Sequence, residues 1–235
     1  MTGEGTPRWY GRRHGRKLRD GRQALLQDLL PRVRLVPPRG GGFLDMKALF
    51  PPPIAEVWLE IGFGGGEHLA AQARAHPDVG LIGCEPYVNG VASLLAHMER
   101  GGFTNIRVFD DDARLLLDSL ADASIGRAFL LFSDPWPKKR HHKRRFISRQ
   151  SLDTLARLLK DGAELRFASD HMGYVRWTLE LATRHPCFRW LAGAKRDWLQ
   201  RPADGFETRY EAKATAAGAV CVHLAFERLK RGAAA

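Results

Sequence analysis

The feature that most constrains the fold is an alternation of short apolar segments with longer, helix-like ones. Five apolar segments have the length of buried strands, and a turn and a helical stretch follow each of them. Because parallel strands need such crossovers, the pattern predicts an α/β fold: a doubly wound, mostly parallel sheet with helices on both faces. Of two closing strands, we expect one near the end to run antiparallel. The predicted strands are residues 57–61, 81–85, 106–109, 127–132, 163–168, 188–191 and 220–226.

The chain divides into a basic lead-in and one folded domain. Residues 1–22 carry seven arginines and lysines among glycines, with Trp9 and Tyr10 between them. We expect this arm to be mobile when alone, and either to order on a polyanion or to remain a solvated tail. Residues 23–53 add a short helix at 24–30 and a Pro/Gly-rich connection. The domain itself takes residues 54–235, in which one amphipathic helix is expected over 147–160, closed by Asp161 and Gly162.

A glycine-rich turn follows the first strand and predicts a ligand that approaches the backbone closely. Its glycines are Gly62, Gly64 and Gly66, whereas a dinucleotide fingerprint would place its third glycine at Glu67. Glu60 precedes the turn. An acidic residue here disfavours a pyrophosphate but suits a ligand without phosphate, such as S-adenosylmethionine.

Acidic residues also follow the next two strands. Glu85 is placed to accept hydrogen bonds from ribose hydroxyls, and Asp112 is placed to reach an adenine amino group, with Asp111 as the alternative. Each acid alone equally suits a helix N-cap or a first-turn carboxylate. Because the acids follow successive strands, the set favours a nucleoside pocket.

Residues 132–145 read FSDPWPKKRHHKRR, directly after the fourth strand. Asp134 lies at the strand's carboxyl end, Trp136 lies between two prolines, and six lysines and arginines follow. A carboxylate, an indole and a cationic surface together can hold a nucleobase and grip its phosphates. The alternative is an Asp-Pro turn followed by a solvated charged face.

The charge balance narrows the class of partner. A net charge of +11 indicates an anionic partner such as nucleic acid. No apolar stretch approaches the roughly 20 residues of a membrane span, and no secretory signal is evident. Three widely separated cysteines predict neither a disulfide framework nor a zinc site, so we expect a cytoplasmic protein. His141 and His142 have no companions at metal spacing, so no metal is expected.

Several segments, in order, resemble those of bacterial tRNA (guanine-N7)-methyltransferases. They are the N-terminal GRRHGRKLR and the later WLEIGFGGG, GCEP, FSDPWPKKRHHKRR, FASD and FETRYE. The resemblance covers nearly the whole chain. It implies a seven-stranded class I methyltransferase sheet, S-adenosylmethionine as donor, and N7 of a variable-loop guanine in tRNA as acceptor. It implies no obligatory protein partner.

The resemblance also implies roles for particular residues. Asp134 would be catalytic, and the donor would be held by Glu60, Gly62, Gly64, Glu85, Asp112 and Asp134. The substrate guanosine would contact Lys138, Asp170, Thr208, Arg209, Tyr210 and Glu211. The RNA would contact Arg140, His141, His142, Lys143, Arg144 and Arg145.

Three alternative functions remain open at this point. An NAD-dependent oxidoreductase is disfavoured by the missing third glycine. A non-catalytic RNA-binding protein would need the basic surface but not the acidic pocket. An exocyclic-amine methyltransferase is the nearer rival, because an acid-proline-aromatic loop after the fourth strand also suits an amino group.

Overall fold

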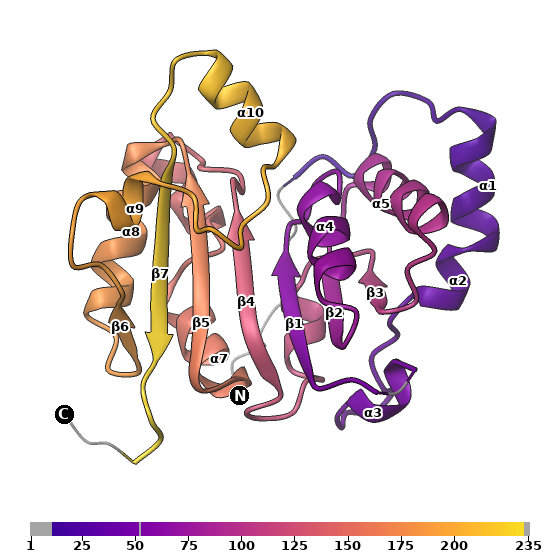
Figure 1. Ribbon diagram of the computed structural model, residues 1–235, viewed down its shortest axis with the longest axis horizontal. Coiled ribbons are helices and arrows are strands. Elements are labelled where there is room, and N and C mark those ends of the chain that lie inside the picture. Colours follow the sequence, from indigo (N-terminus) through magenta and orange to yellow (C-terminus); the bar gives the residue numbers. More distant parts are fainter. Residues whose placement is uncertain (1–10, 52, 233–235) are drawn as a thin grey trace.

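The computed structural model describes residues 11–51 and 53–232, which form a seven-stranded sheet flanked by helices (Figure 1). The strand order is β3-β2-β1-β4-β5-β7-β6. β7 runs antiparallel to both of its neighbours, and all other pairs are parallel. The α/β prediction, including the antiparallel strand near the end, is confirmed. The strands are β1 Glu56–Ile61, β2 Val79–Cys84, β3 Ile106–Phe109, β4 Ile125–Leu131, β5 Leu159–Ser169, β6 Phe188–Trp190 and β7 Val222–Arg228.

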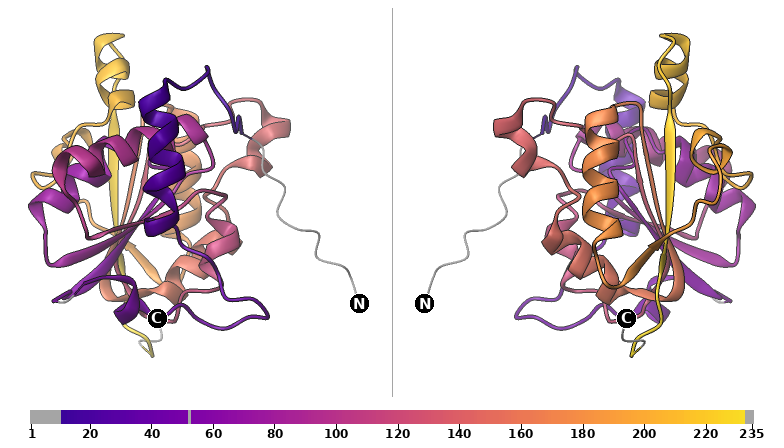
Figure 2. Two further views of the ribbon diagram at one scale, coloured as in Figure 1. Left: turned by 90° about the vertical axis from the view of Figure 1, so that its right-hand side faces the viewer. Right: turned by 90° about the vertical axis from the view of Figure 1, so that its left-hand side faces the viewer.

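The helices cover both faces of the sheet, as Figure 2 shows from its two ends. Successive residues of a strand point to opposite faces, so Trp58 and Leu59 enter different cores. The core around Trp58 is closed by α1 Asp20–Asp28, α2 Leu30–Val33, α4 Glu67–Ala75 and α5 Val88–Gly101. The core around Leu59 is closed by α6 Arg114–Leu117, α7 Arg149–Leu158 and α8 Met172–Thr183.

Short elements complete the chain: α3 Met46–Leu49, the 3-10 helix η1 Lys139–Arg144, α9 Arg196–Leu199 and α10 Arg209–Ala216. In Figure 1, α10 lies above the sheet, beyond the carboxyl ends of the parallel strands. Thr208 caps it by accepting a hydrogen bond from the Glu211 amide, at 3.0 Å. The sequence does not predict α10, because its eight residues have a weak apolar pattern that resembles a loop.

The predicted boundary between the helix at 147–160 and the strand at 163–168 is wrong. The helix expected to end at Asp161 and Gly162 ends at Leu158, and β5 starts at Leu159. Leu159 is fully buried and pairs with Ile125 of β4, so the core draws it into the sheet. Gly162, with a φ of 80°, lies in the irregular stretch before regular pairing resumes at Glu164.

Part of the basic arm lies against the domain. The Val88 amide donates to the Arg13 carbonyl at 2.9 Å, and the Asn89 side chain accepts from the Gly15 amide at 2.8 Å. Residues 11–16 are thus bound at the start of α5, instead of forming a free tail. The predicted features at Arg8, Trp9 and Tyr10 lie outside the described residues. Across residues 11–51 and 53–232, no helix has the length and apolarity to cross a membrane.

Candidate active site

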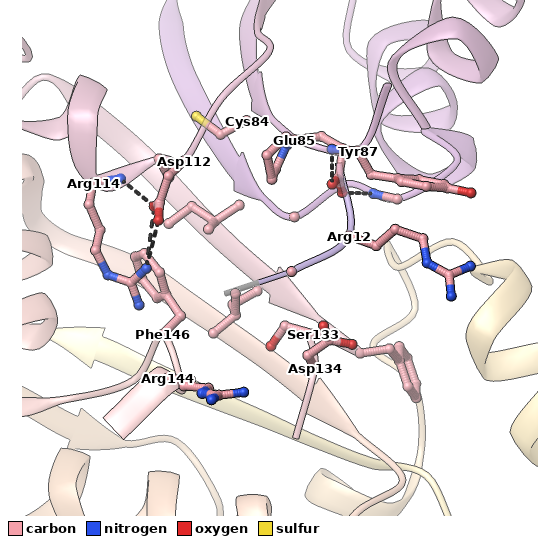
Figure 3. A pocket seen from close by; sticks show the side chains of 18 of the residues that line it. Arg12, Cys84, Glu85, Tyr87, Asp112, Arg114, Ser133, Asp134, Arg144 and Phe146 are labelled. Atoms are coloured by element: carbon pink, nitrogen blue, oxygen red, sulfur yellow. Dashed lines mark hydrogen bonds and ion pairs between the residues drawn. The ribbon is translucent and has the colours of Figure 1, made fainter. Parts of the chain in front are cut away.

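A cavity of about 370 Å³ opens at the carboxyl ends of β1, β2 and β4 (Figure 3). Its walls come from the turns after these strands, from the residues after β3 and from the arm. The predicted site residues that line it are Gly62, Gly64, Glu85, Asp112, Asp134, Arg144 and Tyr210. Residues far apart in the chain thus meet where open α/β sheets bind ligands.

The glycine turn forms the floor of this cavity. Gly62 and Gly64 have φ values of 72° and 57°, which side chains disfavour. A Cβ on Gly62 would meet no protein atom within 4 Å, so the missing side chain leaves space in the cavity. A Cβ on Gly64 would lie 2.8 Å from the Tyr210 ring, so glycine is needed for Tyr210 to cover the turn.

Glu85 is held by the turn that it faces. Its two carboxylate oxygens accept hydrogen bonds from the amides of Gly64, at 2.8 Å, and Tyr87, at 2.9 Å. Burial raises the pKa of Glu85 to about 7, the negative charges of Asp134 and Glu60 add to the rise, and the two amides oppose it. Glu85 therefore changes its charge near neutral pH.

The structure separates the two candidate aspartates after β3. Asp112 is 3% exposed, lines the cavity and forms an ion pair with Arg114 at 3.0 Å. Asp111 is not among the lining residues and pairs instead with Arg13 of the arm, at 2.5 Å. The geometry supports Asp112 as the adenine contact, which remains a prediction.

Asp134 lies at the cavity wall on a strained loop. Phe132 and Trp136, on either side of it, have φ values of 50° and 43°, which are uncommon for large side chains. Partial desolvation raises the pKa of Asp134 above its ordinary value. The Trp136 ring also lines the cavity, with the Arg144 guanidinium carbon 4.8 Å from its centroid.

The basic segment does not form one uniform surface. Lys138, Lys139, Arg140 and Lys143 are exposed. His141 packs edge-on against Trp136 and His142 packs against Trp177. Desolvation and the neighbouring cations lower the pKa of His141.

Arg145 departs most from the expectation of an RNA contact. It is 3% exposed, and its side chain is directed into the protein. The sequence does not distinguish the buried Arg145 from its exposed neighbours, because spacing within a run of lysines and arginines does not show which side chain points inward.

Glu60 also departs from the prediction that it binds the donor directly. It is 2% exposed, is not among the cavity-lining residues, and lies 2.8 Å from Nδ1 of His68 on α4. Strand alternation explains this, since Ile61 lines the cavity and Glu60 points to the opposite face. Its structural contact is with the helix that follows the glycine turn.

The predicted substrate residues 208–211 make different contacts in the structure. Tyr210 lines the cavity, whereas Thr208 caps α10. Arg209 donates to Glu67 at 2.6 Å, and Glu211 is buried and accepts from Arg201 at 3.0 Å. Only Tyr210 of these four faces the cavity.

Two further predicted substrate residues lie outside the cavity lining. Asp170 is exposed immediately after β5, the neighbour of β4. The Phe132 amide, which precedes Asp134, donates to the Ala168 carbonyl at 2.7 Å, so the two strand ends are joined. Lys138 is exposed and precedes η1.

Several residues of the cavity wall are not predicted from the sequence. Arg12, Arg114 and Phe146 reach it from three separate segments, as Figure 3 shows. These three residues share no motif and no regular spacing, so the sequence alone does not identify them as part of one site. In the part of the chain that the structure describes, no His, Cys, Asp or Glu group has a metal-binding arrangement.

Known proteins match this chain over most of its length. A family profile described as "Putative methyltransferase" matches residues 55–224. The chain is 54% identical to a tRNA (guanine-N(7)-)-methyltransferase of Rhodospirillum rubrum, over 96% of this chain and 89% of that protein. It is 52% identical to the tRNA (guanine-N(7)-)-methyltransferase of Paramagnetospirillum magneticum, over 88% of this chain and 87% of that one.

Solved structures are similar in fold. A 16S rRNA methyltransferase superposes with a TM-score of 0.56 at 16% identity, covering 84% of this chain and 99% of that one. An rRNA methylase from Streptococcus thermophilus gives 0.51 at 12% identity, covering 74% of this chain and 87% of that one. At these identities the likeness shows the shared sheet architecture alone.

Proposed function

The chain belongs to the tRNA (guanine-N7)-methyltransferase family, and we propose that its cavity transfers a methyl group from S-adenosylmethionine to N7 of a variable-loop guanine in tRNA. The observation that carries the site assignment is the convergence of Glu85, Asp112 and Asp134 on one cavity beside the glycine turn. The family relatives carry the acceptor assignment.

The residues of the cavity fit the donor. Two buried carboxylates, Glu85 and Asp112, can accept hydrogen bonds from ribose hydroxyls and an adenine amino group. The space over Gly62 accommodates the ligand, and about 370 Å³ lies within the usual range of roughly 300–1,000 Å³ for small-molecule pockets. Three carboxylates around the cavity also suit a sulfonium cation.

When bound, S-adenosylmethionine supplies a sulfonium methyl group, which the in-plane lone pair of guanine N7 takes as the carbon–sulfur bond breaks. N7 carries no proton, so Asp134 need not remove one. In its ionised form, Asp134 would stabilise the positive charge that develops on the purine, and its carboxylate can accept hydrogen bonds from the guanine N1 or N2 hydrogens. The main contribution of the site is to align the reacting groups.

The exposed cations beside the cavity supply the RNA surface in this proposal. Lys138, Lys139, Arg140 and Lys143 lie on the segment that follows Asp134, so phosphates bound there would flank the target base. We propose tRNA as the partner, residues 54–235 as the catalytic domain, residues 1–53 as an arm and lead-in, and the cytoplasm as the location.

The test is methyl transfer from labelled S-adenosylmethionine to unmodified tRNA, followed by nucleoside analysis. We expect the label in 7-methylguanosine. Label in an N-methylated exocyclic amine would keep the donor and overturn the acceptor. Tight tRNA binding without any label would favour the RNA-binding protein instead.

A single-residue variant tests the role of Asp134. In Asp134→Asn the charge is lost while the shape is kept, so the single-turnover rate should fall roughly 10²- to 10³-fold. Asp118→Asn, at an exposed aspartate after α6, is the control and should keep the wild-type rate. A near-normal rate in Asp134→Asn would show that the charge is dispensable.

A further inference from the structure

Arg145 ends the basic segment, but its environment differs from that of its exposed neighbours. The residue is 3% exposed. Its guanidinium carbon lies 5.0 Å from the ring centroid of Tyr174 and 5.3 Å from that of Trp177, both on α8. The Tyr174 side chain is itself fully buried. The guanidinium is therefore enclosed by the protein and does not face solvent where RNA would bind.

The hydrogen bonds of Arg145 lead to the loop that carries Asp134. Its Nε donates to the Pro135 carbonyl at 2.8 Å, and its Nη1 donates to the Gly173 carbonyl at 3.3 Å. The first bond is made to the residue next to Asp134, and the second to the start of α8. One side chain thus ties the Asp134 loop to a helix packed on the sheet.

The bond to Pro135 acts on a strained part of this loop. The Pro135 carbonyl belongs to the peptide unit whose nitrogen is that of Trp136, and Trp136 has a φ of 43°. Such a conformation persists in a large residue only when its surroundings hold it. By fixing that peptide plane, Arg145 restrains the backbone on the carboxyl side of Asp134.

The backbone of Arg145 is joined to the donor side of the cavity as well. The Arg145 carbonyl accepts from Nη2 of Arg114 at 3.3 Å, and Arg114 pairs with Asp112 at 3.0 Å. Arg114 also stacks on Phe146, with its guanidinium carbon 5.1 Å from the ring centroid. Contacts through Arg145 therefore connect the wall at Asp112 with the loop at Asp134.

We propose that Arg145 is a positioning residue for methyl transfer, which sets the Asp134–Trp136 backbone against the donor pocket, and that it does not bind RNA phosphates. The inference rests on the proposed function. It divides the basic segment into exposed cations that bind tRNA and one buried arginine that orders the catalytic loop.

Arg145→Lys is the informative substitution. It keeps the positive charge, but an ammonium cannot reproduce the planar fork that reaches two carbonyls between two aromatic rings. The single-turnover rate at saturating tRNA and S-adenosylmethionine should fall roughly 10- to 100-fold, because small displacements of reacting groups are costly. The dissociation constant for tRNA, and its dependence on salt, should stay within about twofold of wild type.

Two further variants give the contrast. Arg140→Ala, at an exposed cation of the same segment, should weaken tRNA binding and lower the log-log salt slope by about one unit. Arg184→Lys, at a side chain 77% exposed at the end of α8, should leave both rate and affinity at wild-type values. Charge effects and loop effects are thereby measured separately.

Thermal unfolding and donor binding are measured first for every variant. If Arg145→Lys does not fold, Trp177→Leu replaces it, because this change removes one ring beside the guanidinium and should also lower the rate without changing tRNA affinity. If Arg145→Lys weakens tRNA binding but keeps the wild-type single-turnover rate at saturation, the inference about Arg145 is overturned and the proposed function is not. A wild-type protein that forms no 7-methylguanosine would overturn the proposed function, and the inference with it.

Discussion

At the scale of single residues, Glu85 combines a structural role in the glycine turn with a position in the cavity wall. Its carboxylate accepts hydrogen bonds from the amides of Gly64 and Tyr87, and the residue also lines the cavity. The same burial that holds it there raises its pKa to about 7. In the proposed role, its capacity to accept hydrogen bonds from the donor nucleoside should therefore depend on pH in the physiological range.

This environment predicts a pH dependence of donor affinity. A carboxyl group with a pKa near 7 is about nine-tenths ionised at pH 8 and about one-tenth at pH 6. If the ionised form accepts hydrogen bonds from the ribose hydroxyls, as we propose, the apparent dissociation constant for S-adenosylmethionine should rise close to tenfold from pH 8 to pH 6. Calorimetry across this range measures it.

Two substitutions check the assignment to Glu85. Glu85→Gln should bind the donor weakly at both pH values, with little pH dependence left. Glu99→Gln, at an exposed glutamate near the end of α5, should keep the wild-type profile. An unchanged profile in Glu85→Gln would assign the titration to another group.

At the scale of elements, the segment before α10 is bound to the sheet and to α4 through Asp204. The Asp204 carboxylate accepts from Arg166 at 2.7 and 3.0 Å and from Arg127 at 2.9 Å. Burial alone would raise the pKa of Asp204, but the hydrogen bonds and charges of the two arginines hold it below its ordinary value. The Asp204 carbonyl also accepts from Gln72 of α4, at 3.1 Å.

Loosening this attachment should affect catalysis at a distance from the cavity. Asp204→Asn removes the charge that binds the segment to β4 and β5, so Tyr210 should cover the glycine turn less often. We expect kcat/KM for tRNA to fall roughly 3- to 30-fold, within the usual range for one charged contact. The thermal midpoint should change little, because the carboxylate is 42% exposed.

Steady-state kinetics with tRNA measures this effect, with Asp118→Asn again as the control. If Asp204→Asn keeps its kcat/KM, α10 is placed by its own contacts, such as Arg209 with Glu67, and not by the preceding segment.

The elements also show what a sequence can and cannot reveal. The sequence predicts all seven strands, because apolar residues recur in short segments separated by turn residues, and this pattern is visible locally in the chain. Alternation along β1 already indicates that Glu60 faces away from Ile61, although the motif around the glycine turn suggests a direct contact with the ligand. The burial of Arg145 and the contacts of Arg209 and Glu211 depend on residues distant in sequence, which local patterns do not specify.

At the scale of the whole molecule, the net charge of +11 and the exposed cations beside the cavity favour the binding of a polyanion. Affinity for tRNA should therefore fall steeply with salt. Replacing Lys139 and Lys143 by alanine should weaken binding and lower the log-log slope by roughly one to two units. Donor affinity should not change, because neither residue lines the cavity.

Filter binding or fluorescence anisotropy at several salt concentrations measures this slope. Arg184→Ala, remote from the segment, is the control for loss of charge. An unchanged slope in the double variant would mean that the exposed run is a solvated face and that tRNA binds elsewhere.

The most direct measurement of the central claim uses a tRNA transcript in which 7-deazaguanosine replaces guanosine. This base has carbon in place of N7 but keeps the exocyclic amine and the base-pairing edge. We predict that the protein binds this tRNA with an affinity close to that for the normal transcript and transfers no methyl group to it. Methyl transfer to the deaza transcript at a normal rate would show that the acceptor is not N7 and would contradict the account.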